Sequence, residues 1–218
     1  MAAYAHGSRN RLTVRDLARF PSESLFDRVA RAVCRASCLP RKELYEAWEV
    51  ARRVRRRYRG GRVVDVACGH GLVAHLMLLL DDSSPHAVAL DPAVPASAHK
   101  LAASLVETWP RLAGRVRYAP GVLAGLPLAA DDVVVSVHAC GSLTDDVLAA
   151  AVAVRARVAV LPCCHAVTRS PLAGWLDGPL ALDVARAQRL LDAGYEVHTQ
   201  QIDPAVTPKH RLLLGAPT

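Results

Sequence analysis

Hydrophobic positions between residues 62 and 161 fall into short continuous runs, which are separated by longer stretches with helical spacing. Continuous runs of Val, Ala and Leu predict strands buried on both faces, as is typical of a parallel sheet covered by helices. We expect strands at 62–67, 87–90, 115–118, 132–137 and 158–161. We expect helices at 72–80, 96–108 and 142–154. This alternation predicts an α/β fold.

The two ends of the chain differ from this central pattern. Pro21 and Ser22 precede a periodic apolar stretch over 25–33, and Pro40 is expected in the first turn of a second helix that ends at Gly60-Gly61. The buried stripe of the second helix should comprise Leu44, Ala47, Trp48, Ala51, Val54 and Tyr58. A helix at 181–193 and strands at 195–202 and 211–214 predict an antiparallel C-terminal hairpin. We therefore expect a helical lid or extension over 1–60, followed by one domain over 61–218.

Composition narrows the class of protein. The chain has 218 residues, of which 52% are hydrophobic, but no apolar run is long enough to span a bilayer. The first 20 residues lack the apolar core of a signal peptide, so we expect a cytoplasmic protein. The net charge is +7, and nearly all of the 27 basic residues are arginine, which binds phosphate in a bidentate manner. This charge permits an RNA partner, although a solvated basic surface is the simpler interpretation.

A glycine turn follows the first expected strand. The segment Val63–Leu72 places Asp65 inside the strand and Cys68-Gly69-His70-Gly71 directly after it. Glycine has no Cβ, so a turn of this kind lets the backbone approach a nucleotide-like ligand closely. The spacing differs from that of the dinucleotide-binding fingerprint. Asp65 could instead serve only as a turn or helix cap.

Other polar residues end the later strands. Asp91 and Pro92 follow the second strand, where a carboxylate can accept hydrogen bonds from both hydroxyls of a ribose. Val122 follows the third strand, at the position expected for contacts to an adenine. The fourth and fifth strands end in two unusual segments, His138-Ala139-Cys140-Gly141 and Pro162-Cys163-Cys164-His165. Ligands of open parallel sheets bind outside the carboxyl ends of the strands, so all these residues should border one site.

These segments together resemble a group of class I methyltransferases that depend on S-adenosylmethionine (SAM). The group combines an Asp-x-(Ala/Gly)-(Cys/Ser)-Gly-x-Gly turn with a His-x-Cys-Gly segment and a later Cys-Cys-His or Cys-Cys-Tyr segment. It includes tRNA 2′-O-methyltransferases and other methyltransferase domains. The resemblance covers residues 40–166 and implies a Rossmann-like, seven-stranded, mostly parallel sheet with an antiparallel C-terminal hairpin. It also implies SAM as the cofactor. The residues implied to bind it are Asp65, Cys68, Gly69, His70, Gly71, Asp91, Pro92, Val122 and His138.

Several chemistries fit the later segments. His138 or His165 is expected to act as the base that deprotonates a ribose oxygen or a base nitrogen, with RNA, tRNA in particular, as the substrate. Cys140 or Cys164 could instead attack a pyrimidine as a thiolate. A metal site is a third interpretation, and buried histidines and cysteines without a chemical role are a fourth.

The substrate class also stays open. Arg52, Arg53, Arg56, Arg57 and Arg59 should lie on one side of the second helix, where they would face RNA or only solvent. Lys42 and Glu43 open that helix near the expected cofactor cleft. The zinc-finger module of the tRNA enzymes is not recognisable in this sequence. The alternatives are therefore a small-molecule O- or N-methyltransferase and a non-catalytic SAM-binding protein.

Overall fold

The computed structural model describes residues 5–163, 172 and 174–218. Its centre is a seven-stranded sheet in the order β3-β2-β1-β4-β5-β7-β6. The strands are β1 (Val63–Val66), β2 (Ala87–Asp91), β3 (Val116–Pro120), β4 (Val133–Ser136), β5 (Arg157–Val160), β6 (Tyr195–Gln201) and β7 (Arg211–Pro217). Strands β1 to β5 pair in parallel, and β7 runs antiparallel to both β5 and β6. The predicted fold, including the antiparallel C-terminal strands, is confirmed.

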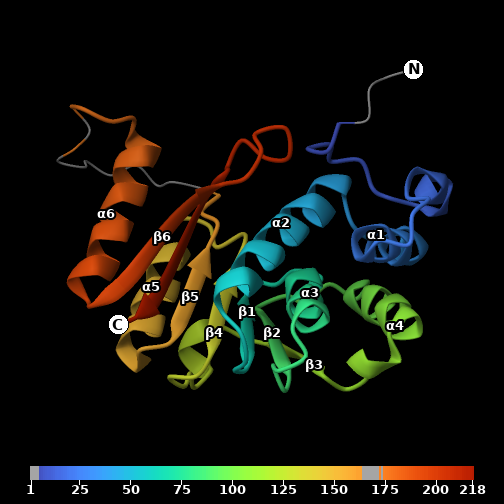
Figure 1. Cartoon of the computed structure of the whole chain (residues 1–218), viewed down its shortest axis with the longest axis horizontal. Helices are drawn as coiled ribbons and strands as arrows, with labels where there is room; N and C mark the ends of the chain where they lie inside the picture. Colours follow the sequence, from blue (N-terminus) through green and yellow to red (C-terminus); the bar gives the residue numbers. More distant parts are fainter. Residues whose placement is uncertain (1–4, 164–171, 173) are drawn as a thin grey trace.

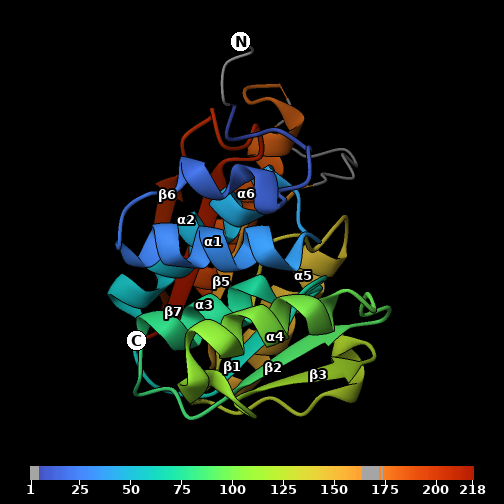
Figure 2. The same cartoon turned by 90° about the vertical axis from the view of Figure 1, so that its right-hand side faces the viewer.

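Helices cover both faces of the sheet (Figure 1, Figure 2). One side carries α1 (Leu25–Ala36), α2 (Arg41–Arg57), α3 (Leu72–Leu80) and α4 (Ala98–Thr108). The other side carries α5 (Leu143–Val154) and α6 (Gly178–Asp192). Alternate strand residues divide between the two cores: Val63 and Val133 pack with the first group, and Val64 and Val134 with the second. None of the helices that the structure describes is long and apolar enough to cross a membrane.

Helix α2 is part of the main core. Leu44, Ala51 and Val54 are fully buried in it, as expected for the predicted stripe. Two boundaries differ from the prediction. Pro40 is the residue before the helix instead of part of its first turn, and the helix ends at Arg57 because Tyr58 already has extended backbone angles.

The ends of two later helices also differ from the prediction. Helix α5 begins at Leu143, one residue later than predicted, and Ser142 at its N-terminal boundary makes no capping bond with its side chain. Helix α6 begins at Gly178, earlier than predicted, because the Asp177 side chain accepts a hydrogen bond from the Leu180 amide. A proline in the first turn of α6 is compatible with this early start, since its missing N–H would have no helical partner there.

Candidate active site

The turn after β1 is held by backbone hydrogen bonds. The Cys68 amide donates to Leu90 O over 3.1 Å, and the Gly71 amide donates to Cys68 O over 2.8 Å. Gly69 and Gly71 have φ angles of 52° and 72°, which favour glycine. A Cβ at Gly71 would come within 2.8 Å of the Tyr118 ring, whereas a Cβ at Gly69 would have no atom within 4 Å. Gly71 is therefore needed for packing, and Gly69 faces open space where a ligand can approach.

Asp65 lies beneath this turn and is buried. Its carboxylate accepts a hydrogen bond from the Ala74 amide in the first turn of α3 over 3.1 Å. Burial raises the pKa of Asp65 to about 7, despite this bond, and the nearby charge of Asp91 adds to the rise. Asp65 thus tethers α3 to the end of β1, and it also borders a cavity beside the glycine turn.

Asp91 connects the ends of β1, β2 and β3. One carboxylate oxygen accepts from the Gly69 amide over 3.0 Å, and the other accepts from the Ala93 amide over 2.9 Å. The main-chain oxygen of Asp91 accepts from the Gly121 amide, which precedes Val122. Pro92 is exposed, and Val122 is 61% exposed. The structure therefore brings Gly69, Asp91 and Val122 to one edge of the sheet.

His70 and Cys68 lie within the same turn. His70 Nε2 is 2.9 Å from Ser97 Oγ, and the Tyr118 hydroxyl donates to His70 O over 2.9 Å. Burial, followed by the charge of Arg11, lowers the pKa of His70, so its imidazole is neutral at pH 7. Burial also raises the pKa of the Cys68 thiol well above its usual range, which makes Cys68 a poor nucleophile.

The turn after β4 places His138 opposite α2. His138 and Glu43 line both a narrow cavity of about 30 Å³ beside the glycine turn and a neighbouring pocket of about 240 Å³. The larger pocket is also lined by Arg9, Lys42 and Glu46. His138 Nε2 lies 3.5 Å from Glu46 Oε2. Burial lowers the pKa of His138, whereas the charge of Glu46 raises it and that of Lys42 lowers it further.

Glu46 and Arg9 were not predicted from the sequence. Lys42 and Glu46 are four residues apart on α2 and form an ion pair of 2.9 Å, a spacing that usually indicates an exposed helix face. Glu46 is instead only 1% exposed. Only one feature of the sequence could have indicated Glu46 as a site residue. It lies one helical turn after Glu43, which also faces the site. Burial and the charge of Glu46 raise the pKa of Glu43.

The predicted cysteines are only partly within the described residues. The Sγ atoms of Cys140 and Cys163 lie 3.0 Å apart, so the ends of β4 and β5 meet as expected. Cys164 and His165 lie outside the described residues. Within residues 5–163, 172 and 174–218, no three His, Cys, Asp or Glu side chains are grouped in a way that would hold a metal ion.

The sheet order, the glycine turn after β1 and the acidic residue that ends β2 together define a Rossmann-like methyltransferase fold. A family model described as a methyltransferase domain matches residues 42–170, and the chain belongs to this family. The match begins at α2, so the family domain includes the helix that carries Glu46. No curated protein matches the chain.

Solved structures with the same fold have low sequence identity to this chain. An O-methyltransferase family protein from Burkholderia thailandensis is 19% identical with a TM-score of 0.55, covering 97% of this chain and 65% of that protein. A precorrin-6y methyltransferase from Geobacter metallireducens is 15% identical with a TM-score of 0.50, covering 78% and 87%. A tRNA methyltransferase from B. subtilis is 14% identical with a TM-score of 0.50, covering 78% and 65%. This chain spans about two thirds of the Burkholderia protein, and at these identities the likeness concerns the fold alone.

Proposed function

We propose that the chain is a SAM-dependent methyltransferase that modifies RNA, tRNA in particular, at a ribose oxygen or a base nitrogen. The observation that carries the proposal is the pair of pockets between the glycine turn and α2, which His138 joins. SAM supplies a methyl group on a positively charged sulfur when it is bound. The protein holds the acceptor in line with this group and removes a proton from it. We assign the proton acceptor to His138, whereas Cys140, Cys164 and His165 stay predictions.

The residues around the glycine turn fit a nucleoside cofactor. The open space at the Gly69 Cβ position lets a ligand contact the backbone. Each Asp91 carboxylate oxygen accepts one backbone hydrogen bond and keeps a further lone pair for a ribose hydroxyl. We assign the methionine end to Asp65 and to the turn of Cys68, Gly69, His70 and Gly71. We assign the ribose to Asp91 and Pro92, and the adenine to the surface at Val122.

We further propose that residues 1–60 cover the cofactor site of residues 61–218. Leu39, Glu43 and Ala47 form the wall of the narrow cavity opposite Cys68 and His70. Apolar burial fixes this wall in place, since Val50 and Val54 of α2 are fully buried. In this arrangement the helical extension excludes water from the reacting groups.

RNA is supported by the charge around the larger pocket. Arg9 lines the pocket, and Arg11 lies close enough to lower the pKa of His70. Both arginines are exposed, and neither forms an ion pair with a carboxylate of the described residues. The guanidinium group of Arg9 at the pocket, with that of Arg11 near His70, suits the phosphates of an RNA backbone.

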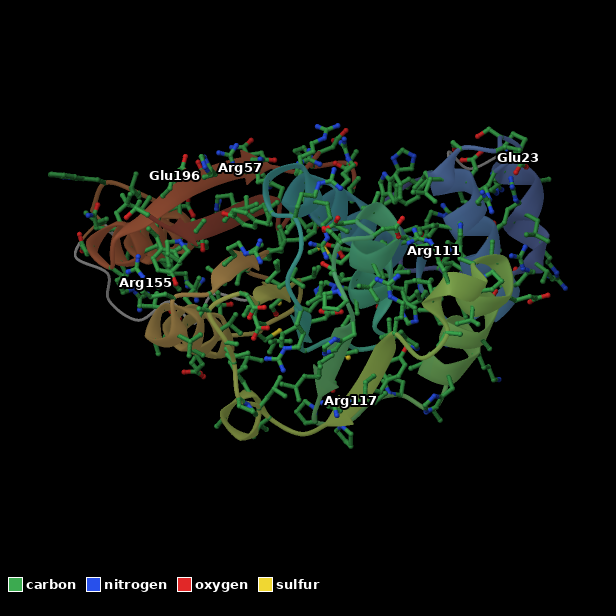
Figure 3. The ribbon with its side chains drawn as sticks, turned by 60° about the horizontal axis from the view of Figure 1, so that its bottom comes forward. Glu23, Arg57, Arg111, Arg117, Arg155 and Glu196 are labelled. Atoms are coloured by element: carbon green, nitrogen blue, oxygen red, sulfur yellow. The ribbon has the colours of Figure 1, made fainter. Side chains whose placement is uncertain are left out.

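A small-molecule acceptor is the second candidate, and the arginines of α2 favour it. Arg52 and Arg53 both pair with Glu49. Arg57 pairs with Glu196 of β6, and Figure 3 shows these two side chains next to each other at the sheet edge. These three arginines of the predicted RNA-binding face of α2 are thus engaged with carboxylates of the protein. A pocket of about 240 Å³ also approaches the size of a small-molecule site.

The test incubates the purified protein with methyl-labelled SAM and total RNA from a strain that lacks the gene. We expect label in nuclease-sensitive material for the wild type and none for Asp91→Ala, whose SAM affinity should fall about 10- to 100-fold. Asp203→Ala is the matched control. Like Asp91, Asp203 accepts a hydrogen bond from the amide two residues later, here in the loop between β6 and β7. The RNA proposal is supported if the wild type labels RNA and the Arg9→Ala and Arg11→Ala variants label it less. SAM binding without labelled RNA contradicts it and moves the assignment to a small molecule.

A further inference from the structure

Glu46 is a buried carboxylate that the proposed function does not yet use. Its side chain is 1% exposed, and Oε1 is 2.9 Å from Lys42 Nζ. Oε2 is buried and has no hydrogen-bond partner among the described residues. The His138 ring nitrogen Nε2 lies 3.5 Å from Oε2, slightly beyond hydrogen-bond length. Glu46 therefore directs an unsatisfied acceptor at an imidazole that borders the pocket.

A structural role explains this arrangement poorly. The other buried acid near α2, Asp81, accepts hydrogen bonds from the Gly60 amide and the Ser83 hydroxyl and pairs with Arg55. Both carboxylate oxygens of Asp81 thus have partners, as expected for a buried acid with a structural role. Burying a carboxylate oxygen without a donor costs free energy that an apolar residue on α2 would not. The cost is understandable if Oε2 acts on His138.

We propose that Glu46 is a positioning residue for His138, holding the imidazole with its Nε2–H directed at Oε2 and leaving Nδ1 as the proton acceptor. The inference rests on the proposed function. In the step it supports, the O–H or N–H bond of the acceptor breaks, its proton moves to Nδ1, and the electron pair stays on the acceptor atom as the nucleophile. The imidazolium formed then faces the negative charge of Glu46, which stabilises it.

The charges around the pair set the direction of each expected change. Lys42, Glu43 and Arg9 line the same pocket as Glu46 and His138. Glu46 raises the pKa of His138 and Lys42 lowers it. Removing the negative charge with Glu46→Gln should therefore lower the pKa of His138. Lys42→Gln is the matched control on the same helix and should raise it.

The first measurement needs no substrate. Nitrogen NMR of histidine-labelled protein, with His138→Asn to assign the signal, gives the tautomer and the pKa of His138. We expect the Nε2–H tautomer in the wild type, a pKa lower by about one in Glu46→Gln and a higher pKa in Lys42→Gln. The inference would be overturned if the tautomer and the pKa of His138 were unchanged in Glu46→Gln. It would also be overturned if His138 of the wild type carried its proton on Nδ1.

The second measurement uses the RNA methylation assay. Glu46→Gln should lower kcat at least about 10-fold and leave KM and SAM affinity unchanged. Because the pKa of His138 is lower in this variant, the acid limb of the pH profile of kcat should move to lower pH. A kcat for Glu46→Gln equal to that of the wild type at every pH would overturn the inference. If Glu46→Gln does not fold, the tautomer of His138 in the wild type provides the test, because an Nδ1–H imidazole would overturn the inference. An absence of RNA methylation by the wild type would count against the proposed function alone, since the NMR measurement still decides the role of Glu46.

Discussion

The turns after β1 and β4 lie at the same edge of the sheet, but they are held in different ways. In the first turn the amides of Cys68, Gly69 and Gly71 all donate to acceptors within the protein. In the second turn His138 faces a buried carboxylate on α2, far earlier in the chain. The first turn is thus held mainly by hydrogen bonds within the turn and to the end of β2. In the second turn the environment of His138 depends on packing between segments that are far apart in the sequence. Three substitutions test this difference.

Gly71→Ala should have the largest effect. Its Cβ would come within 2.8 Å of the Tyr118 ring at a φ angle of 72°, so we expect a loss of about 2–4 kcal/mol in the free energy of unfolding. Urea unfolding followed by circular dichroism measures this. Gly69→Ala is the matched control, because its φ is also positive but its Cβ meets no atom within 4 Å. We expect it to lose only about 1–2 kcal/mol while weakening SAM binding. Equal losses would show that the Tyr118 contact is unimportant.

Asp65→Asn should change how stability depends on pH. Burial raises the pKa of Asp65 from its ordinary value of 3.8 to about 7, so the folded state binds more protons than the unfolded state between these values. The contribution of Asp65 is fully present below pH 3.8 and is lost as the pH rises through 7. The side-chain amide of the variant does not titrate, so the stability of the variant relative to the wild type should rise over this range.

Urea unfolding at several pH values checks the prediction for Asp65. His75, whose pKa burial lowers to about 4, has the opposite effect, because its contribution is lost as the pH falls from 6.5 through 4. His75 is present in both proteins, so its contribution cancels in the difference. Parallel stability curves for the wild type and the variant would contradict the raised pKa of Asp65.

Thr144→Val should have the smallest effect, and it acts on the turn after β4. The buried Thr144 hydroxyl donates to Ala139 O over 2.7 Å, next to His138. Its loss should lower the free energy of unfolding by about 1 kcal/mol and leave SAM affinity, measured by titration calorimetry, unchanged. Thr144→Ser keeps the hydroxyl and should restore most of the stability. A weakened SAM affinity in Thr144→Val would show that the two turns are coupled.

Local patterns were sufficient to predict most of the fold. The continuous apolar runs located β1 to β5 within two residues, because strands buried on both faces need no long-range information to be recognised. The pattern missed the short 3-10 helix at Val14–Arg19, although Thr13 and Asp16 form a capping box there. It also could not place β7 between β5 and β6, since strand order depends on contacts across the sheet.

The candidate site divides in the same way. Asp65, Gly69 and Asp91 were predicted because a turn between a buried strand and a helix has a local signature, and the structure brings all three to one edge. Glu46 was missed because an i, i+4 pair with Lys42 usually indicates a surface feature. Its burial depends on the packing of α2 near the turn after β4, which the pattern of the sequence does not show. The assigned roles of these residues remain predictions.

Arg55 links the wall of the site to the stability of the whole molecule. It is 1% exposed and donates to Met77 O, Tyr58 O and Ser84 Oγ while pairing with Asp81. Through it, the helix that faces the pocket is fastened to the far end of α3. A substitution that moves α2, and with it the wall of the pocket, is therefore expected to change the melting temperature of the protein as well. Arg9, which lines the larger pocket from outside α2, takes no part in these Arg55 contacts.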